Sequence, residues 1–287
     1  MTAVLFVLTA LLWGGGALAT AMQAGVTPAP WSVALRMVLA GLILLGYGWL
    51  RGVPLTIPRK DRLAVALQGL LFFAIAFIAF YEATARMPSG LAALVLSTSS
   101  LFAAVIARTA LGVPISPSLV WGALCGILGL AIIFLPGATA HGAAPPLAGL
   151  AWALAAAIAT GAGTTVGARN QRAGLPVVSV LAWGAFIGAA ASALWAVATG
   201  TPFAADVSLS YLTSFLYLAV AASCVTFMLY FELVRRLGPG RAAYTLALVP
   251  LVALVLSALF EHLALGWPVL AGAAAILAGN VLVLARA

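Results

Sequence analysis

The sequence predicts an all-α integral membrane protein with ten transmembrane helices. Of its 287 residues, 65% are hydrophobic and only 6% are charged, and the mean hydropathy is +1.22. A soluble domain carries about 25% charged residues, and the 13 basic and 5 acidic side chains present here could not cover the surface of one. The composition therefore excludes soluble enzymes, nucleic-acid-binding proteins and disordered chains.

Apolar stretches bounded by charged residues, proline and glycine define the ten spans. A helix needs about 20 mainly apolar residues to cross a hydrocarbon core of roughly 30 Å. The stretches cover residues 2–22, 30–50, 62–82, 89–108, 118–136, 146–168, 176–199, 209–231, 241–260 and 267–285. The connections between them are too short for an extramembrane domain. No Lys or Arg precedes the first apolar run, so we expect an uncleaved helix there rather than a signal peptide.

The basic residues orient these spans, because Lys and Arg are enriched in cytoplasmic loops. If the N-terminus is cytoplasmic, Arg86 alone falls on the opposite side and Arg36 lies inside the second span. The residues that fall on the cytoplasmic side are Arg51, Arg59, Lys60, Arg62, Arg108, Arg169, Arg172, Arg235, Arg236, Arg241 and Arg286. We therefore expect both termini in the cytoplasm.

An internal repeat relates the two halves of the chain. A shift of 150 residues places 80–93 over 230–243. The aligned pairs of identical residue type include Glu82 with Glu232, Arg86 with Arg236, and Gly90 with Gly240. We expect two units, residues 1–137 and 146–287. Each would hold five helices, an odd number, so the second unit would cross the membrane in the opposite sense.

Inverted repeats are common in secondary transporters, whose substrate sites lie near the membrane midplane between the repeats. The repeat therefore favours a transporter. The alternative is a shared helix-packing pattern without a transport role.

Several motifs resemble the drug/metabolite transporter superfamily, and specifically its ten-helix EamA-type exporters. They are Trp13-Gly14, the run that starts at Arg36, the crossing at 83–93, the stretch 248–261 around Pro250, and Gly279-Asn280. The first half departs from the pattern, since Ser100 stands where the second has Pro250. The resemblance implies export of small metabolites across the cytoplasmic (inner) membrane by a multi-pass protein. Within the family, the chain is similar to YddG-type aromatic amino-acid exporters.

Polar and aromatic side chains within the spans are the candidates for a substrate cavity, because polar groups in hydrocarbon are costly unless they face a cavity or one another. The hydroxyl run 97–100 either faces such a cavity or bonds its own helix carbonyls. The indole N–H of Trp13 needs a partner when buried, and its ring offers a stacking surface. The candidate cavity residues are Trp13, Tyr81, Ser97, Ser99, Ser100, Trp152, Thr164 and Tyr244.

A second group of residues is expected to have structural or gating roles. Arg36 could attract a substrate carboxylate or reach the interface, but we expect it to pair with Glu82. The pairs Glu82–Arg86 and Glu232–Arg236 have the i,i+4 spacing of helix salt bridges. Pro250 should kink the ninth span and leave carbonyl groups free. Glu261 is expected to be solvated.

The distribution of acidic residues bears on the mechanism. No Asp or Glu lies near the middle of a span, which disfavours proton antiport of cationic drugs and fits a uniporter for neutral or zwitterionic solutes. Amino acids fit an aromatic and hydroxyl lining. Multidrug or organic-cation efflux by proton antiport is the main alternative. An intramembrane enzyme and a channel are less favoured, because their catalytic groups or filter loops are not found.

The expected partners are a small-molecule substrate and the lipid bilayer. We expect no nucleic acid, no obligatory protein partner and no cofactor. Cys125 and Cys224 lie in apolar runs, where they are expected to fill space rather than to bind metal. The chain has no Gly-x-x-x-x-Gly-Lys-Ser/Thr motif for a nucleotide.

Overall fold

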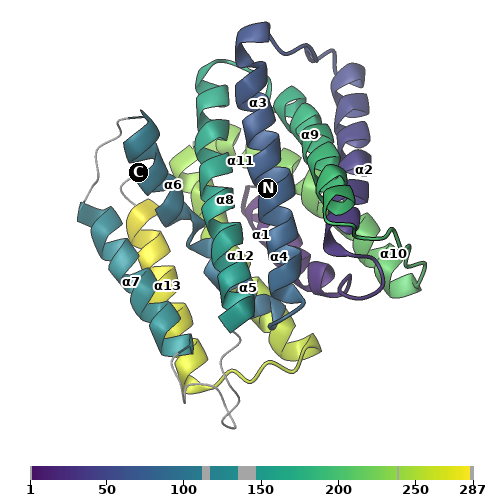
Figure 1. The fold of residues 1–287 in the computed structure, drawn as a ribbon. Helices are drawn as coiled ribbons and strands as arrows, with labels where there is room; N and C mark the ends of the chain where they lie inside the picture. Colours follow the sequence, from purple (N-terminus) through teal and green to yellow (C-terminus); the bar gives the residue numbers. More distant parts are fainter. Residues whose placement is uncertain (1, 112–116, 135–146, 238, 285–287) are drawn as a thin grey trace.

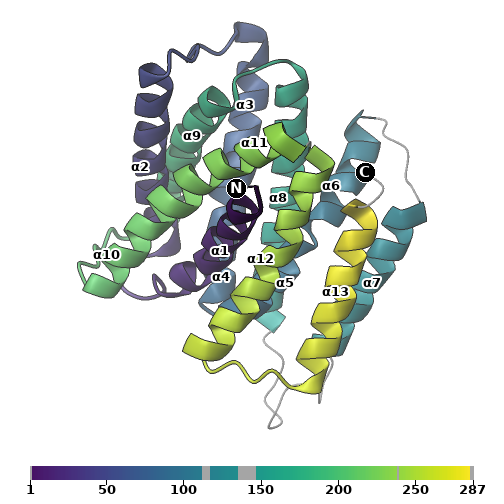
Figure 2. The same cartoon turned by 180° about the vertical axis from the view of Figure 1, so that it is seen from behind.

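The computed structural model describes residues 2–111, 117–134, 147–237 and 239–284, apart from the side chains of 110, 111, 231, 235, 239–241, 243, 244, 283 and 284. Every regular element in these ranges is helical (Figures 1 and 2). The all-helical membrane class predicted from composition is therefore confirmed for this part of the chain. The predicted boundary between the two units, at 137–146, lies entirely outside the described residues.

The elements follow the predicted spans in order. The first half contains α1 (Thr2–Ala21), α2 (Ala29–Leu50), η1 (Arg59–Asp61), α3 (Arg62–Gln68), η2 (Gly69–Ile75), α4 (Ala76–Thr84), α5 (Ser89–Ser97), α6 (Ser99–Leu111) and α7 (Pro117–Phe134). The second half contains α8 (Leu147–Arg172), α9 (Val177–Ala198), α10 (Leu209–Leu216), η4 (Tyr217–Val225), α11 (Thr226–Leu237), α12 (Pro239–Phe260) and α13 (Trp267–Leu284).

Eight helical stretches in the described residues are long and apolar enough to cross a membrane. They are Thr2–Ala21, Ala29–Leu50, Arg59–Thr84, Ser89–Thr109, Pro117–Phe134, Leu147–Arg172, Val177–Ala198 and Leu209–Val234. Two shorter apolar helices, Thr245–Phe260 and Trp267–Leu282, follow them. The chain is thus a multi-pass membrane protein. The count of ten spans and the direction of each span stay predictions.

Three of these stretches have interruptions that hydropathy did not predict. The segments η2 and η4 are π-helical, a form that is frequent at functional sites. Between α5 and α6 the helix breaks at Thr98, whose N–H bonds to the Val95 carbonyl at 3.0 Å. These interruptions change which residues share a helix face.

The helices pack in pairs that join the two halves of the chain. The helices α7 and α13 lie side by side at the left of Figure 1, and α2 and α9 lie together at the right. Between them, α1 packs on α12, and α8 packs on α4, α5 and α6. Large apolar side chains such as Leu42, Ile127 and Leu194 are exposed on the outside, where lipid would cover them.

Glycines bring α7 and α13 into backbone contact. A Cβ added at Gly272 would lie 2.6 Å from the carbonyl oxygen of Gly129, and one added at Gly279 would lie 2.6 Å from that of Gly122. Small residues allow this kind of close approach between membrane helices. The pair therefore depends on glycine at these positions.

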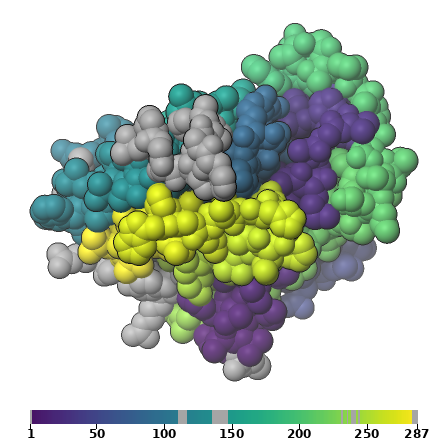
Figure 3. All heavy atoms as spheres, turned by 90° about the horizontal axis from the view of Figure 1, so that it is seen from below, coloured from purple at the N-terminus to yellow at the C-terminus, as the bar shows by residue number. Residues whose placement is uncertain are grey.

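Most of the basic residues lie at one end of the molecule, which we call the basic end and which is uppermost in Figure 1. There, η1 supplies Arg59 and Lys60, and Arg172 ends α8. Arg86 follows α4 at the opposite end. Seen from below, the end of α12, residues 261–266 and the start of α13 cross that opposite face as a yellow band (Figure 3). Arg286 lies outside the described residues.

Candidate functional site

Arg36 lies within α2 and is buried, with only 6% of its surface exposed. Its Nε and Nη2 both donate to Ser223 Oγ of η4, at 3.2 and 3.0 Å. Its guanidinium carbon lies 4.4 Å from the centre of the Phe77 ring of α4, within the range of a cation–π contact. In the described residues, no carboxylate lies within salt-bridge distance of Arg36.

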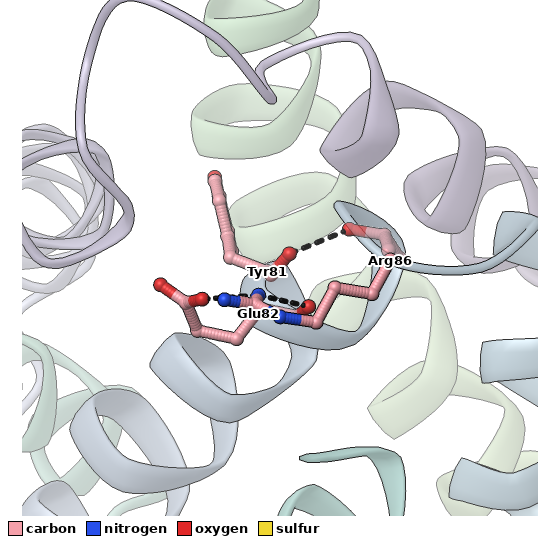
Figure 4. A network of polar contacts seen from close by, with 4 residues as sticks. Tyr81, Glu82 and Arg86 are labelled. Carbon is pink, nitrogen blue, oxygen red and sulfur yellow. Dashed lines mark hydrogen bonds and ion pairs between the residues drawn. The ribbon is translucent and has the colours of Figure 1, made fainter. Parts of the chain in front are cut away.

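The predicted pairing of Arg36 with Glu82 is therefore wrong. Glu82 instead forms an ion pair with Arg86 at the end of the same helix, and Arg86 Nη1 also donates to the Glu82 carbonyl at 2.7 Å (Figure 4). Tyr81 points away from this pair. Adjacent helix residues diverge by about 100°, so Tyr81 reaches the protein interior while Glu82 stays at the surface.

Tyr81 and Gln23 join Arg36 in one buried polar cluster. The Tyr81 hydroxyl donates to Gln23 Oε1 at 2.8 Å, and the phenol lies beside the Arg36 guanidinium. Gln23 is 2% exposed, and its Nε2 has no hydrogen-bond partner among the described residues. Sequence reasoning identified Arg36 and Tyr81 but missed Gln23. The signal that could have found it is a lone amide just after the first apolar run.

Trp13 fixes α1 to the eighth span. Its Nε1 donates to the Ala222 carbonyl of η4 at 3.1 Å. The ring lies 5.3 Å from that of Phe227 in a T-shaped arrangement and 5.2 Å from that of Tyr230. The adjacent Gly14 leaves room for α12, because an added Cβ would lie 2.5 Å from the Val252 side chain.

The hydroxyl run 97–100 contacts the last helix. Asn280 Nδ2 donates to Ser97 Oγ at 3.0 Å, and Ser100 Oγ donates to Asn280 Oδ1 at 3.0 Å. Ser97 also donates to the Leu94 carbonyl of its own helix at 2.7 Å. Thus both expectations for the run apply in part: the hydroxyls bond their own carbonyls and also face a polar group. Asn280, only 4% exposed, was not among the predicted site residues.

The two candidates on α8 lie on different sides of that helix. Thr164 follows the fully buried Ala157 by seven residues, which places it on nearly the same side. Thr164 is nevertheless exposed, whereas its neighbours Gly163 and Thr165 are buried.

Trp152 is 38% exposed. It precedes Ala157 by five residues, so it lies on a different side of α8 from Ala157 and Thr164. Trp152 is not among the side chains that contact the Trp13 ring, which are Phe227 and Tyr230 in the described residues.

The remaining residues predicted for the cavity or for gating take part in fewer contacts. Ser99 is half-buried and Pro250 is buried within α12. The side chain of Tyr244 lies outside the described part of the structure. Arg236 Nε lies 2.6 Å from Glu232 Oε1, the second i,i+4 pair.

Glu261 was expected to be solvated, but its carboxylate forms hydrogen bonds within the protein, so that expectation is wrong. Its Oε2 accepts hydrogen bonds from the backbone N–H of Ser89 at 3.0 Å and from Ser89 Oγ at 2.6 Å. The carboxylate thereby caps the N-terminus of α5, where unpaired backbone N–H groups and the helix dipole favour negative charge.

Four of the five acidic residues lie at helix ends or in connections, and Glu232 lies within α11. Asp61 is buried beside η1, and Arg169 Nη1 donates to its Oδ1 at 2.6 Å. Asp206 Oδ1 accepts from the Ser208 N–H at 2.8 Å in the segment before α10. Among the described residues, no group of three His, Cys, Asp or Glu side chains could hold a metal ion.

Two apolar grooves lie apart from the polar cluster. One, of about 330 Å³, lies between α1 and the η4 helix and includes Gly15, Met22 and Tyr217. The other, of about 360 Å³, lies between α2 and α9 and includes Leu35, Val38 and Phe186. Their apolar linings suit lipid chains.

With this geometry, comparison with known proteins identifies the family. A model of the EamA-like transporter family matches residues 1–135 and 147–285. The chain belongs to the EamA-like transporter family. As a member, it is a membrane transporter of the drug/metabolite transporter superfamily, and the family is one of transporters rather than enzymes.

A solved structure described only as "Crystal structure of protein" has the same fold as this EamA-like chain. It aligns with a TM-score of 0.67 and 23% sequence identity, over 98% of this chain and 95% of that one. No curated protein matches the sequence.

Proposed function

We propose that this EamA-like transporter exports amino acids, aromatic or otherwise amphipathic, and related small metabolites from the cytoplasm as a uniporter. The observation that carries the proposal is the placement of charge. Four of the five acidic residues lie at helix ends or in connections, and the fifth, Glu232 of α11, is paired with Arg236, whereas the cation of Arg36 is buried inside a span. Such a distribution of charge suits a solute with a carboxylate better than a cationic drug that is exchanged for a proton.

The aromatic cluster of Trp13, Phe227 and Tyr230 supports an aromatic or amphipathic solute. Ring faces attract other rings and the apolar part of a side chain. Thr164, exposed on α8, is a further candidate for the lining of the transport path. We place the substrate between the first span and the second half, near the polar cluster of Arg36.

Alternating access between two inverted five-helix units is the mechanism that we propose. Two features related by the 150-residue shift support it. The segment η2 begins at residue 69 and η4 covers residue 219. Likewise the contact of Gly129 with Gly272 corresponds, with the halves exchanged, to that of Gly279 with Gly122. A twofold axis between the halves would relate each pair.

The proposed orientation puts the basic end in the cytoplasm. Ten spans with both termini cytoplasmic give the strong bias of Arg and Lys toward one side, and an exporter of metabolites would lie in the cytoplasmic (inner) membrane. In this arrangement Arg86 and the Glu261 cap lie on the outer side. The two ion pairs Glu82–Arg86 and Glu232–Arg236 would then act at opposite ends of the transport path as gates.

The test is transport by the purified protein in proteoliposomes. We expect radiolabelled phenylalanine and tryptophan to move down their gradients without a proton gradient, with competition by unlabelled amino acid. If amino acids do not move, but a cationic dye moves only with a proton gradient, organic-cation antiport replaces the proposal.

A further inference from the structure

The buried cluster around Arg36 has more hydrogen-bond donors than acceptors. A guanidinium carries five N–H groups, of which two donate to one oxygen, Ser223 Oγ, and the Tyr81 hydroxyl is the other oxygen beside it. The Gln23 amide nitrogen adds two further N–H groups without a partner. Buried polar groups in native proteins are nearly always satisfied, so this cluster lacks an acceptor.

In the part of the chain that the structure describes, no carboxylate forms an ion pair with Arg36. Glu82 and Asp61, the acidic residues of its half, are each paired with another arginine. Phe77 offers a ring face 4.4 Å from the guanidinium carbon, but a cation–π contact leaves the in-plane N–H groups available. A charge in hydrocarbon without a counter-ion is costly and marks a functional site.

Four elements converge at this point. Arg36 comes from α2, Tyr81 from α4, Ser223 from η4, and Gln23 from the residues just after α1. Cys224, next to Ser223, contacts the Ala40 carbonyl of α2 at 3.7 Å. The π-helical form of η4 therefore lies where the cluster is assembled. Residues from both halves of the chain contribute, as a substrate site between repeats requires.

We infer that Arg36, Gln23 and Tyr81 form a carboxylate-binding subsite, with Ser223 holding the guanidinium in place. A carboxylate supplies two oxygens with about four acceptor sites and matches the fork of a guanidinium. The inference rests on the proposed function for the solute that carries the carboxylate, an amino acid. In this subsite Arg36 recognises the substrate carboxylate, instead of forming the structural pair with Glu82 that the sequence predicted.

The first test is ligand-dependent thermal stability of the purified protein in detergent. The probes are L-phenylalanine, 3-phenylpropionate, which keeps ring and carboxylate, and L-phenylalaninol, which keeps ring and amine. We expect the two carboxylates to raise the unfolding midpoint by about 2–5 °C at concentrations far above Kd, and the alcohol to have no effect. Equal shifts with phenylalaninol would overturn the inference.

Two substitutions make the test specific. Arg36→Gln should weaken carboxylate binding at least about tenfold. Gln23→Glu places a carboxylate of the same shape next to the Tyr81 hydroxyl, in the cluster that holds the guanidinium. It should therefore raise the unfolding midpoint without ligand and abolish the shift with ligand. Arg172→Gln is the matched control, because it removes an exposed arginine at the end of α8 and should bind like the wild type.

The outcomes separate this inference from the proposed function. If the wild type transports phenylalanine but Arg36→Gln and Gln23→Glu keep the same preference for carboxylates, the subsite is wrong and the function stands. If 3-phenylpropionate binds in an Arg36-dependent way but no amino acid is transported, the subsite stands and the function is wrong. An equal Arg36-dependent shift with chloride alone would contradict carboxylate recognition.

Discussion

Trp13 joins the first helix to the second half of the molecule by a polar contact and by ring packing. Its indole N–H satisfies a carbonyl of η4 at 3.1 Å, and its ring meets two aromatic side chains of α11. The Ala222 carbonyl lies in a π-helical segment, where the regular backbone bonding is altered. A substrate ring that approaches this cluster would meet Trp13 or the rings it orders.

Trp13→Ala should reduce transport of phenylalanine at least about tenfold, because it removes both contacts and one stacking face. Trp152→Ala is the matched control, since Trp152 is 38% exposed on another side of α8, and it should change transport less than about twofold. The measurement is initial flux in proteoliposomes at equal protein incorporation. Equal losses in the two variants would remove Trp13 from the site.

Asn280 links the last helix to the break between α5 and α6. Asn280→Leu should lower the free energy of unfolding by about 0.5–1.5 kcal/mol, because it breaks the bonds to Ser97 and Ser100 in a medium with few alternative partners. When Ser97→Ala is added to the Asn280→Leu variant, the free energy of unfolding should fall little further, because the hydrogen bond between the two residues is already lost. The unfolding midpoint in detergent measures both, and additive losses would show that the two residues act independently.

At the scale of elements, backbone contact holds α7 against α13. Gly272→Ala would place a Cβ 2.4 Å from Ile133 Cγ1 and 2.6 Å from the Gly129 carbonyl oxygen. We expect a loss of about 1–3 kcal/mol, because backbone cannot move aside as a side chain can. Gly46→Ala is the matched control in α2. Its Cβ would meet nothing within 4 Å, so helix propensity predicts a gain of about 0.5–1 kcal/mol.

The measurement is the unfolding midpoint of each variant. Gly272→Ala should lower the midpoint, and Gly46→Ala should raise it. If Gly272→Ala left the midpoint unchanged, the close approach of α7 and α13 would not be a stabilising contact.

Much of this element-level description could be predicted from the sequence, and the reasons are local. Hydropathy over about 20 residues and the charges at helix ends fix where a span begins and ends. The π-helical forms at η2 and η4 and the break at Thr98 have no local signature, because they depend on which neighbours the helix packs against. Ser97 and Ser100 lie on either side of this break, and both contact Asn280.

The site was less predictable for a related reason. Spacing along one helix predicts the partners of Arg86 and Arg236, which lie four residues away. The surroundings of Arg36 come from four elements, so its partner could not be read from spacing, and the expected pairing with Glu82 was wrong. Gln23 and Asn280 were missed because a single amide in an apolar run has meaning only when its neighbours are known.

At the scale of the whole molecule, contacts between the two halves are the main feature. The pairs α2 with α9 and α7 with α13 lie at opposite sides of the molecule, and α1, α8 and α12 lie between them (Figure 2). A carrier that alternates between two states needs such contacts to form and break at each end.

Counterflow tests the central claim, a carrier for amino acids, most directly. Proteoliposomes loaded with unlabelled phenylalanine would be diluted into a trace of labelled phenylalanine, without a proton gradient. A carrier that alternates between two faces predicts transient accumulation of label above its equilibrium level, and the same preload of phenylalaninol should not drive it. Simple equilibration without an overshoot in the wild type would contradict the account.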